Sequence, residues 1–201
     1  MRRRTKLTIL VLVVIVLGGV GLIASTLRYG FSAHDRPTMV EQMIAGQLRH
    51  WAAPSDLRDV KNPVPLTPDV LVEARAHFAD HCAICHGNDG KGQTEMGQHM
   101  YPRAPDMTLT KTQSLTDGEL FSIIENGIRL TGMPGWGNGT PESGRGSWTL
   151  VHFVRHMPKI TAAEVAEMEK MNPKSPGEYE QMKQEEEFLE GGEAPALPHH
   201  H

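Results

Sequence analysis

The most chemically specific pattern in this sequence of 201 residues is the run Cys82-Ala83-Ile84-Cys85-His86. Two thiols three positions apart can each add to one vinyl group of a haem, and an imidazole that follows at once is then held under the iron as an axial ligand. The run therefore predicts one covalent haem c, with Cys82 and Cys85 as attachment points and His86 as a ligand of the iron. The chain has two cysteines in all, which limits it to one such haem.

Two other readings of the cysteine pair are a thioredoxin-like redox pair and half of a zinc site. The sequence has no second cysteine pair to complete a zinc site. It also lacks the alternation of strands and helices that a thioredoxin fold requires. Neither alternative explains the adjacent His86, so covalent haem is the favoured interpretation.

An iron that only carries electrons needs a sixth ligand, and Met133 is the best candidate among 11 methionines. A soft thioether favours the reduced iron and raises the reduction potential relative to a second histidine. Met133 lies in the run Thr131-Gly132-Met133-Pro134-Gly135-Trp136-Gly137, where glycine permits close backbone approach and proline stiffens the loop. Met96, Met100 and Met107 are weaker candidates because none lies between a helix end and such a turn.

Three helices are predicted to position these residues, and no segment has the pattern of a strand. The first begins at Thr67-Pro68 and runs toward Cys82. The second opens with a capping box of Thr116 and Glu119 and ends near residue 127. The third is predicted over residues 147–157, before Pro158. The expected fold class is all-α.

Residues 1–27 are predicted to be an uncleaved membrane anchor. Leu7 to Leu27 gives 21 uncharged positions between Lys6 and Arg28. At 1.5 Å per residue such a helix is about 31 Å long, enough to cross a bilayer. The alternative is a cleaved signal peptide, whose apolar core is usually about 7 to 15 residues long. The basic residues at positions 2–4 would stay cytoplasmic, so the rest of the chain is expected on the periplasmic side of a bacterial inner membrane.

Residues 28–66 are interpreted as a stalk, because prolines interrupt any long element there. They are Pro37, Pro54, Pro63 and Pro65. Within the stalk, Val40, Ile44 and Leu48 recur at four-residue spacing and predict a short amphipathic helix, with Trp51 just beyond. The apolar face of this helix is expected either to pack on the exported domain or to rest on the bilayer, and packing is favoured.

Residues 67–157 resemble a class I c-type cytochrome domain, which covers 91 of the 201 residues. Phe78 stands four residues before Cys82, as an aromatic residue does in the first helix of that family. Ala74 occupies a position where the family usually has glycine and where its terminal helices cross. The resemblance implies a single-haem cytochrome c fold with an N-terminal transmembrane helix and a C-terminal helical extension.

The resemblance also implies a second set of residues around the haem. The segment of residues 101–107 matches the family's proline-bearing loop, whose carbonyl accepts the free ring N–H of the haem-binding histidine. Either Pro102 or Pro105 would orient His86 in this way. Arg103 and Trp136 are weaker candidates for partners of a haem propionate.

Residues 158–201 form an acidic tail with 10 acidic and 4 basic residues. Capping boxes at Thr161 with Glu164 and at Ser175 with Glu178 predict two helices. Their narrow apolar stripes would suit packing on the haem domain or on a partner. The run of residues 185–187 either steers a basic partner or is simply solvated. The final His199 to His201 are either a purification tag or a natural chelating tail.

Two histidine pairs, His77 with His81 and His152 with His156, have a four-residue spacing that can hold a metal. No third ligand is in view for either pair. We expect these histidines to be exposed or bonded within the protein.

The charge distribution argues against nucleic-acid binding, since the net charge is −4 and no basic face lies beyond residue 6. The favoured function is a one-electron carrier between exported or membrane redox partners, and not an enzyme. One alternative is a haem subunit of a larger respiratory or metal-oxidising complex. The less favoured alternative is an open-site haem enzyme or gas sensor, for which the sequence shows no distal histidine-arginine pair.

Overall fold

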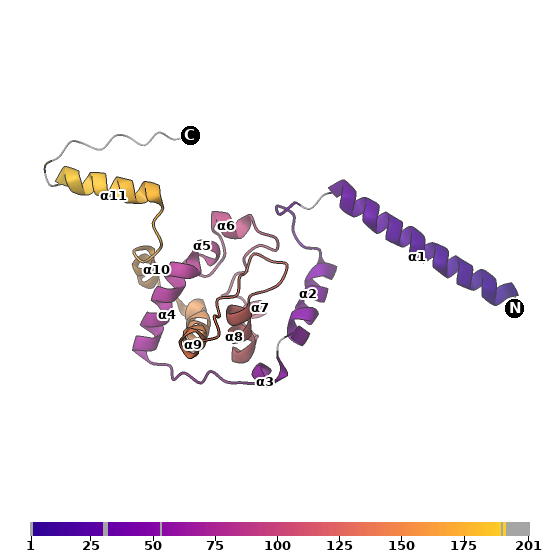
Figure 1. Ribbon diagram of the computed structural model, residues 1–201, viewed down its shortest axis with the longest axis horizontal. Helices are drawn as coiled ribbons and strands as arrows, with labels where there is room; N and C mark the ends of the chain where they lie inside the picture. The colour runs from indigo at the N-terminus through magenta and orange to yellow at the C-terminus, as the bar shows by residue number, and fades with distance from the viewer. Residues whose placement is uncertain (1, 30–31, 53, 190, 192–201) are drawn as a thin grey trace.

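The computed structural model describes residues 2–29, 32–52, 54–189 and 191. Over these residues the regular structure is helical and contains no strand, which confirms the all-α prediction (Figure 1). The helices are α1 (Arg2–Tyr29), α2 (Met39–Ala52), α3 (Ser55–Arg58), α4 (Pro68–His81), α5 (Ala83–His86), α6 (Glu95–Gln98), α7 (Thr110–Gln113), α8 (Asp117–Asn126), α9 (Pro141–His156), α10 (Ala162–Glu169) and α11 (Pro176–Leu189), with a 3-10 turn η1 at Met157–Lys159.

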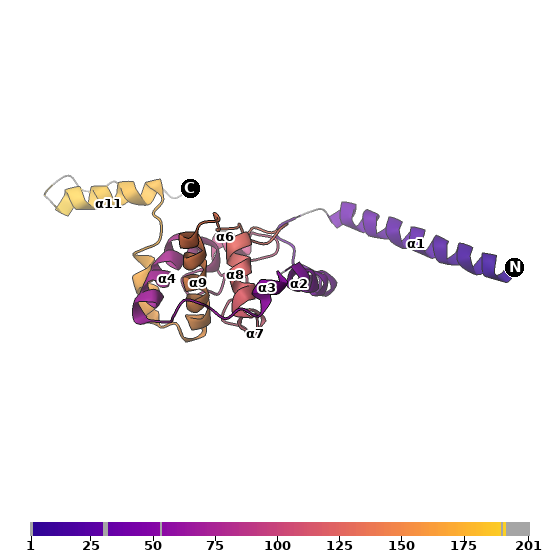
Figure 2. The same cartoon turned by 60° about the horizontal axis from the view of Figure 1, so that its bottom comes forward.

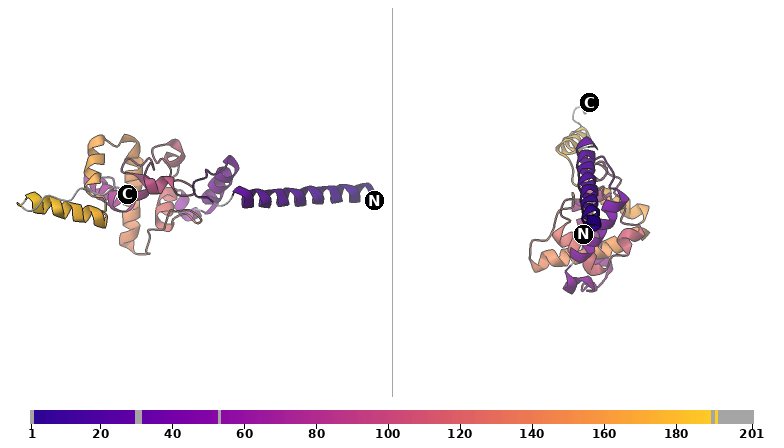
Figure 3. Two further views of the ribbon diagram at one scale, coloured as in Figure 1. Left: turned by 90° about the horizontal axis from the view of Figure 1, so that it is seen from above. Right: turned by 90° about the vertical axis from the view of Figure 1, so that its right-hand side faces the viewer.

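Helix α1 extends away from the other helices (Figure 1 and Figure 3). Its segment Arg3–Ser25 spans 23 residues with a mean hydropathy of 3.0, and none of it is buried within the protein. A helix of this length and composition is able to cross a membrane. This agrees with the anchor expected from the sequence.

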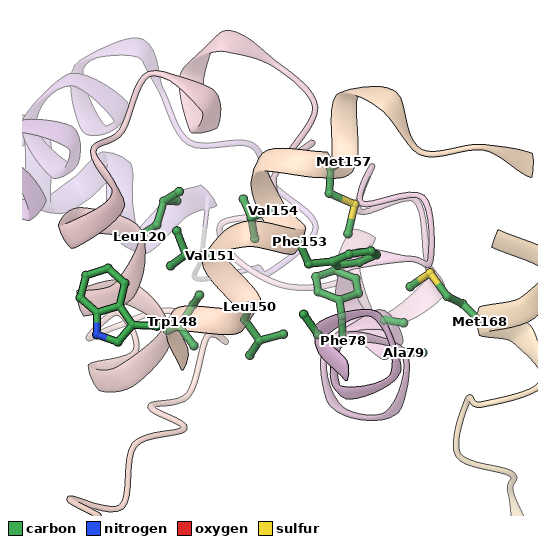
Figure 4. Close-up of a cluster of buried hydrophobic side chains, with 13 residues drawn as sticks. Phe78, Ala79, Leu120, Trp148, Leu150, Val151, Phe153, Val154, Met157 and Met168 are labelled. Carbon is green, nitrogen blue, oxygen red and sulfur yellow. The ribbon is translucent and has the colours of Figure 1, made fainter. Parts of the chain in front are cut away.

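Helices α4 and α9 pack across each other and form the centre of the hydrophobic core (Figure 4). Ala74 and Phe153 are fully buried, and the rings of Phe78 and Phe153 lie 5.2 Å apart between centroids. The small side chain of Ala74 lets the two helices approach closely. Helix α4 begins as predicted, because the Thr67 hydroxyl accepts a hydrogen bond from the Val70 N–H and Pro68 is its first residue.

Helix α9 begins at Pro141, six positions before the start predicted at residue 147. The Thr140 hydroxyl accepts a hydrogen bond from the Ser143 N–H, and Pro141 takes the first helical position, where its missing N–H costs nothing. The prediction was wrong because Gly144 and Gly146 are poor helix formers. The cap and the packing of the following residues outweigh them.

Helix α8 has the predicted capping box, in which Thr116 and Glu119 each bond the other's backbone N–H. It packs on α9 through stacked Phe121 and Trp148 rings, 4.2 Å apart. Asp117 at its start pairs with Arg155 of α9 at 2.8 Å. Helix α8 is therefore fixed to the same helix that packs on α4.

The acidic tail begins with α10, which packs on α4 as expected. Its Met168 is fully buried in the core cluster. Arg75 of α4 pairs with Glu164 and Glu167 at 3.5 and 2.7 Å, and His156 lies 2.8 Å from Glu164. The second tail helix, α11, buries no residue and projects from the domain (Figure 2). The alternative in which the α11 stripe packs on the haem domain is therefore wrong.

Helix α2 forms where the sequence predicts it, but its apolar face does not pack on the domain. Val40, Ile44, Leu48 and Trp51 are each more than half exposed. The favoured packing of this face was therefore wrong. Polar side chains of α2 make its contacts with the domain instead, among them Glu41 and His50.

The capping carboxylate of α10 gives a prediction about pH. Burial raises the pKa of Glu164, but hydrogen bonds from Thr161 and His156 outweigh burial and hold that pKa below its ordinary value. A carboxylate with a lowered pKa in the folded state stabilises the fold above its unfolded pKa and loses that effect as the pH falls through the folded value. We expect Glu164→Ala to lower the free energy of unfolding by about 1 to 2 kcal/mol at neutral pH.

Urea unfolding of wild type, Glu164→Ala and the exposed control Glu169→Ala at several pH values measures this effect. The difference between wild type and Glu164→Ala should shrink below about pH 4.5 and the control should match wild type throughout. A difference that is the same at acidic and neutral pH would contradict the assignment.

Candidate haem site

Helix α4 leads directly into the cysteine pair. Cys82 closes α4 by donating its N–H to the Phe78 carbonyl at 2.9 Å, and α5 follows as one tight turn in which the His86 N–H bonds the Cys82 carbonyl at 3.0 Å. This turn brings both thiols and the imidazole to one cavity of about 190 Å³. Met133 lines the same cavity, so the structure brings all four predicted site residues together.

Both thiols are free and are held in their neutral form. Burial, followed by the neighbouring Cys85, raises the pKa of Cys82 to about 12. Burial also raises the pKa of Cys85. A reactive redox pair needs a thiolate, which a lowered pKa would favour. The surroundings of these thiols therefore argue against a reactive redox pair.

His86 is buried as a neutral ring. Burial lowers the pKa of His86 to about 4, although the backbone carbonyl of Pro105 has the smaller effect of raising that pKa. A neutral imidazole is the form that binds a metal ion. Its Nδ1 is buried and makes no hydrogen bond of standard geometry to any part of the chain that the structure describes. The sequence did not decide whether Pro102 or Pro105 faces the His86 ring. The structure favours Pro105, whose carbonyl raises the pKa of His86.

The loop after α5 is braced by backbone hydrogen bonds. The Gly92 N–H bonds the His86 carbonyl at 2.7 Å, and the Thr94 hydroxyl bonds the Cys85 carbonyl at 3.0 Å. A side chain at Gly97 would collide with that same Cys85 carbonyl. This loop therefore holds the backbone of the cysteine and histidine residues from outside the cavity.

The loop that carries Met133 is docked on the end of α8. Gly127 ends α8 with a φ of +67°, and the Ile128 N–H bonds the Met133 carbonyl at 3.1 Å. The Trp136 N–H bonds back to the Ile124 carbonyl at 3.0 Å. These bonds fix the loop, so the position of Met133 depends on α8.

A second methionine, Met100, also lines the cavity. The sulfur of Met100 packs against Gly132, directly beside Met133. Met96 and Met107 lie elsewhere, Met96 in a shallow pocket beside Ile84 and Met107 against the core. Of the four methionines considered as ligands of the iron, the two that line the cavity are therefore Met100 and Met133.

His81, His152 and His156 are exposed or bonded within the protein, as expected from the sequence, whereas His77 is partly buried. His152 Nε2 lies 2.7 Å from the Val64 carbonyl, and His156 interacts with Glu164. The His77 and His81 rings meet edge to face, 5.0 Å apart, and His81 lines the cavity beside Trp136. Among the residues that the structure describes, no group of three metal-binding side chains occurs.

Three cations line the cavity, and no described carboxylate does. They are Arg49, Arg103 and Lys111. Sequence reasoning identified Arg103 but missed the other two, because neither belongs to a motif and Arg49 comes from the stalk. Arg103 also has a buried Nε without a hydrogen-bond partner in the described chain.

The site fits a haem. Its thiols, neutral imidazole and thioethers are the groups that attach and ligate haem c, and its cations suit the two propionate carboxylates of that group. The buried Arg103 Nε is a hydrogen-bond donor that the described chain leaves unused. When bound, haem would supply a reversible one-electron change at the iron.

The contact between Gly127 and the Met133 loop gives a second prediction. A methyl group at residue 127 would lie 2.5 Å from the Gly135 nitrogen and from the Pro134 carbonyl carbon. Gly127→Ala should therefore displace the loop, at about 1 to 3 kcal/mol beyond the strain of a positive φ.

Gly139→Ala is the matched control, since Gly139 has a φ of +80° but no neighbour within 4 Å of the added carbon. Urea unfolding should show the larger loss of stability for Gly127→Ala, and the Trp136 amide should exchange with solvent faster in that variant alone. If both variants lost the same free energy of unfolding, the contact of Gly127 with the Met133 loop would not contribute to stability.

The comparison with known proteins agrees with this geometry. The model of the family described as cytochrome c oxidase, cbb3-type, subunit III matches residues 70–154. No curated protein matches the chain. The matched range contains the cysteine pair, His86 and Met133. The chain therefore contains a class I c-type cytochrome domain, which binds haem c covalently and is typical of electron carriers.

Proposed function

We propose that this protein is a membrane-anchored, single-haem carrier that passes one electron at a time between exported or membrane redox partners. Cys82 and Cys85 would hold the haem through thioether bonds, and His86 and Met133 would ligate its iron. The observation that carries the proposal is the single cavity that both thiols, the buried imidazole and the Met133 thioether share.

Each of these residues has a defined task. Burial keeps His86 neutral, so its ring offers a lone pair across the whole physiological pH range. Pro105 orients that ring through its carbonyl. Met133 presents a soft sulfur from a loop fixed to α8. Two protein ligands would leave the iron no open position, which would favour electron transfer over substrate binding.

The haem domain is proposed to lie on the periplasmic side of the membrane that α1 spans. Helix α1 is long and apolar enough to span a bilayer and begins with basic residues. Basic residues usually remain on the cytoplasmic side, which supports a periplasmic location for the haem domain. Haem is attached to cysteines in exported compartments, which agrees with a haem domain on the periplasmic side.

A second candidate function is a haem-bearing subunit of a larger respiratory complex. The matched family is named for an oxidase subunit, and α2 and α11 each expose apolar side chains. Both candidates use the same haem chemistry. They differ in whether the protein co-purifies with constant companions from solubilised membranes.

The ligand assignment gives a third prediction. In the oxidised protein, Met133→Ala should abolish the sulfur-to-iron charge-transfer absorption band, because the variant lacks the ligating thioether. The reduced variant should bind carbon monoxide rapidly, whereas reduced wild type should bind it slowly or not at all. Absorption spectra of the purified, haem-loaded proteins measure both effects.

Met100→Ala is the control, because Met100 lines the same cavity. It should keep the band and resist carbon monoxide. Loss of the band in Met100→Ala with its retention in Met133→Ala would reverse the assignment. Rapid carbon monoxide binding by reduced wild type would instead favour an open-site enzyme or sensor.

A further inference from the structure

Helix α2 contributes one residue to the lining of the haem cavity, although it lies outside the cytochrome domain. Its Arg49 lines the same cavity as His86 and Met133. The family match begins at residue 70, well after α2 ends. In Figure 1 and Figure 2, α2 stands beside the loops of the domain on the side from which α1 extends.

Three polar contacts with residues of the cytochrome domain hold α2 at this position. The Tyr101 hydroxyl donates to Glu41 at 3.2 Å, Lys111 donates to Gln42 at 3.4 Å, and His50 lies 2.8 Å from Glu119. The first two contacts are exposed, and helix α2 buries no residue. Exposed polar contacts contribute little each, so these contacts alone hold the helix weakly.

In the described chain, Arg49 has no partner in ion-pair contact, and its charge interacts with the Glu119 carboxylate only at longer range. Arg103 donates to Gln98 and to the His34 carbonyl, and Lys111 donates to Gln42. Across the residues that the structure describes, Arg49 has neither a hydrogen bond nor an ion pair, although it is only partly exposed. A partly buried guanidinium with no carboxylate in hydrogen-bond contact leaves its donors unsatisfied, which costs free energy. The cavity beside it is therefore a place where an anionic group would bind.

We propose that Arg49 binds a propionate carboxylate of the haem, so that α2 completes the haem site. This inference rests on the proposed function, which places the haem in this cavity. The planar guanidinium matches a carboxylate with two parallel hydrogen bonds. The bond adds to the three polar contacts, and haem loading seats α2 on the domain.

The charge of Arg49 should raise the reduction potential of the haem iron. A cation beside the propionate offsets negative charge near the iron and so disfavours the oxidised, more positive state. Removing the Arg49 cation should therefore favour the oxidised iron. In Arg49→Gln, the ratio of oxidised to reduced protein at a fixed ambient potential should rise by about threefold to tenfold, where tenfold corresponds to 59 mV.

The test uses the full chain, matured in a host that attaches haem c and then solubilised in detergent. Wild type, Arg49→Gln, Arg49→Lys and the control Arg36→Gln are compared. Arg36 is an exposed arginine in the same stalk, and its replacement changes the net charge equally. Redox titration gives the midpoint potential, and hydrogen exchange of residues 39–52 reports how firmly α2 is seated.

We expect a lower potential and faster exchange over α2 in Arg49→Gln, with Arg36→Gln like wild type and Arg49→Lys between them. Identical behaviour of Arg49→Gln and Arg36→Gln in both measurements would overturn the proposal. If Arg49→Gln fails to mature, Arg49→Lys must still load haem and stay close to wild type, and its failure would also overturn it. A wild-type chain without covalent haem would instead overturn the proposed function.

Discussion

The packing of α9 on α4 is the interaction on which the rest of the structure depends. Helix α4 runs directly into Cys82, so the contact of Ala74 and Phe78 with α9 sets the position of both thiols and His86. Helix α8 packs on the other side of α9 and holds the Met133 loop at its end. Through α9, the two sides of the haem cavity are fixed relative to each other.

The second determinant is the low polarity of the cavity. Burial keeps His86 neutral and raises the pKa of both cysteines, so the site offers a lone pair and two thiols rather than a set of charged ligands. The charges that do reach the cavity are all positive and come from three separate segments. This combination of an apolar centre and a cationic border suits a flat apolar group that carries carboxylates.

The sequence predicted well wherever a local signal carried the information. Thr67-Pro68 and the capping box at Thr116 located α4 and α8, because caps act within one turn of helix. The start of α9 was missed because two glycines obscured a valid cap at Thr140. The exposed apolar face of α2 and the presence of Arg49 at the cavity were missed for another reason, and Met100 was named only as a weaker candidate ligand. They depend on contacts between segments far apart in the chain, which periodicity and spacing do not encode.

The measurement that tests the account most directly is the fate of the pigment when the protein is denatured. After maturation in a host with haem-attachment machinery, the full chain should keep its colour through extraction with acidified organic solvent. Its mass should exceed that of the polypeptide by one haem, and a Cys82→Ser, Cys85→Ser double variant should lack this bound pigment. A colourless wild-type protein, or a pigment that the solvent removes, would contradict the account.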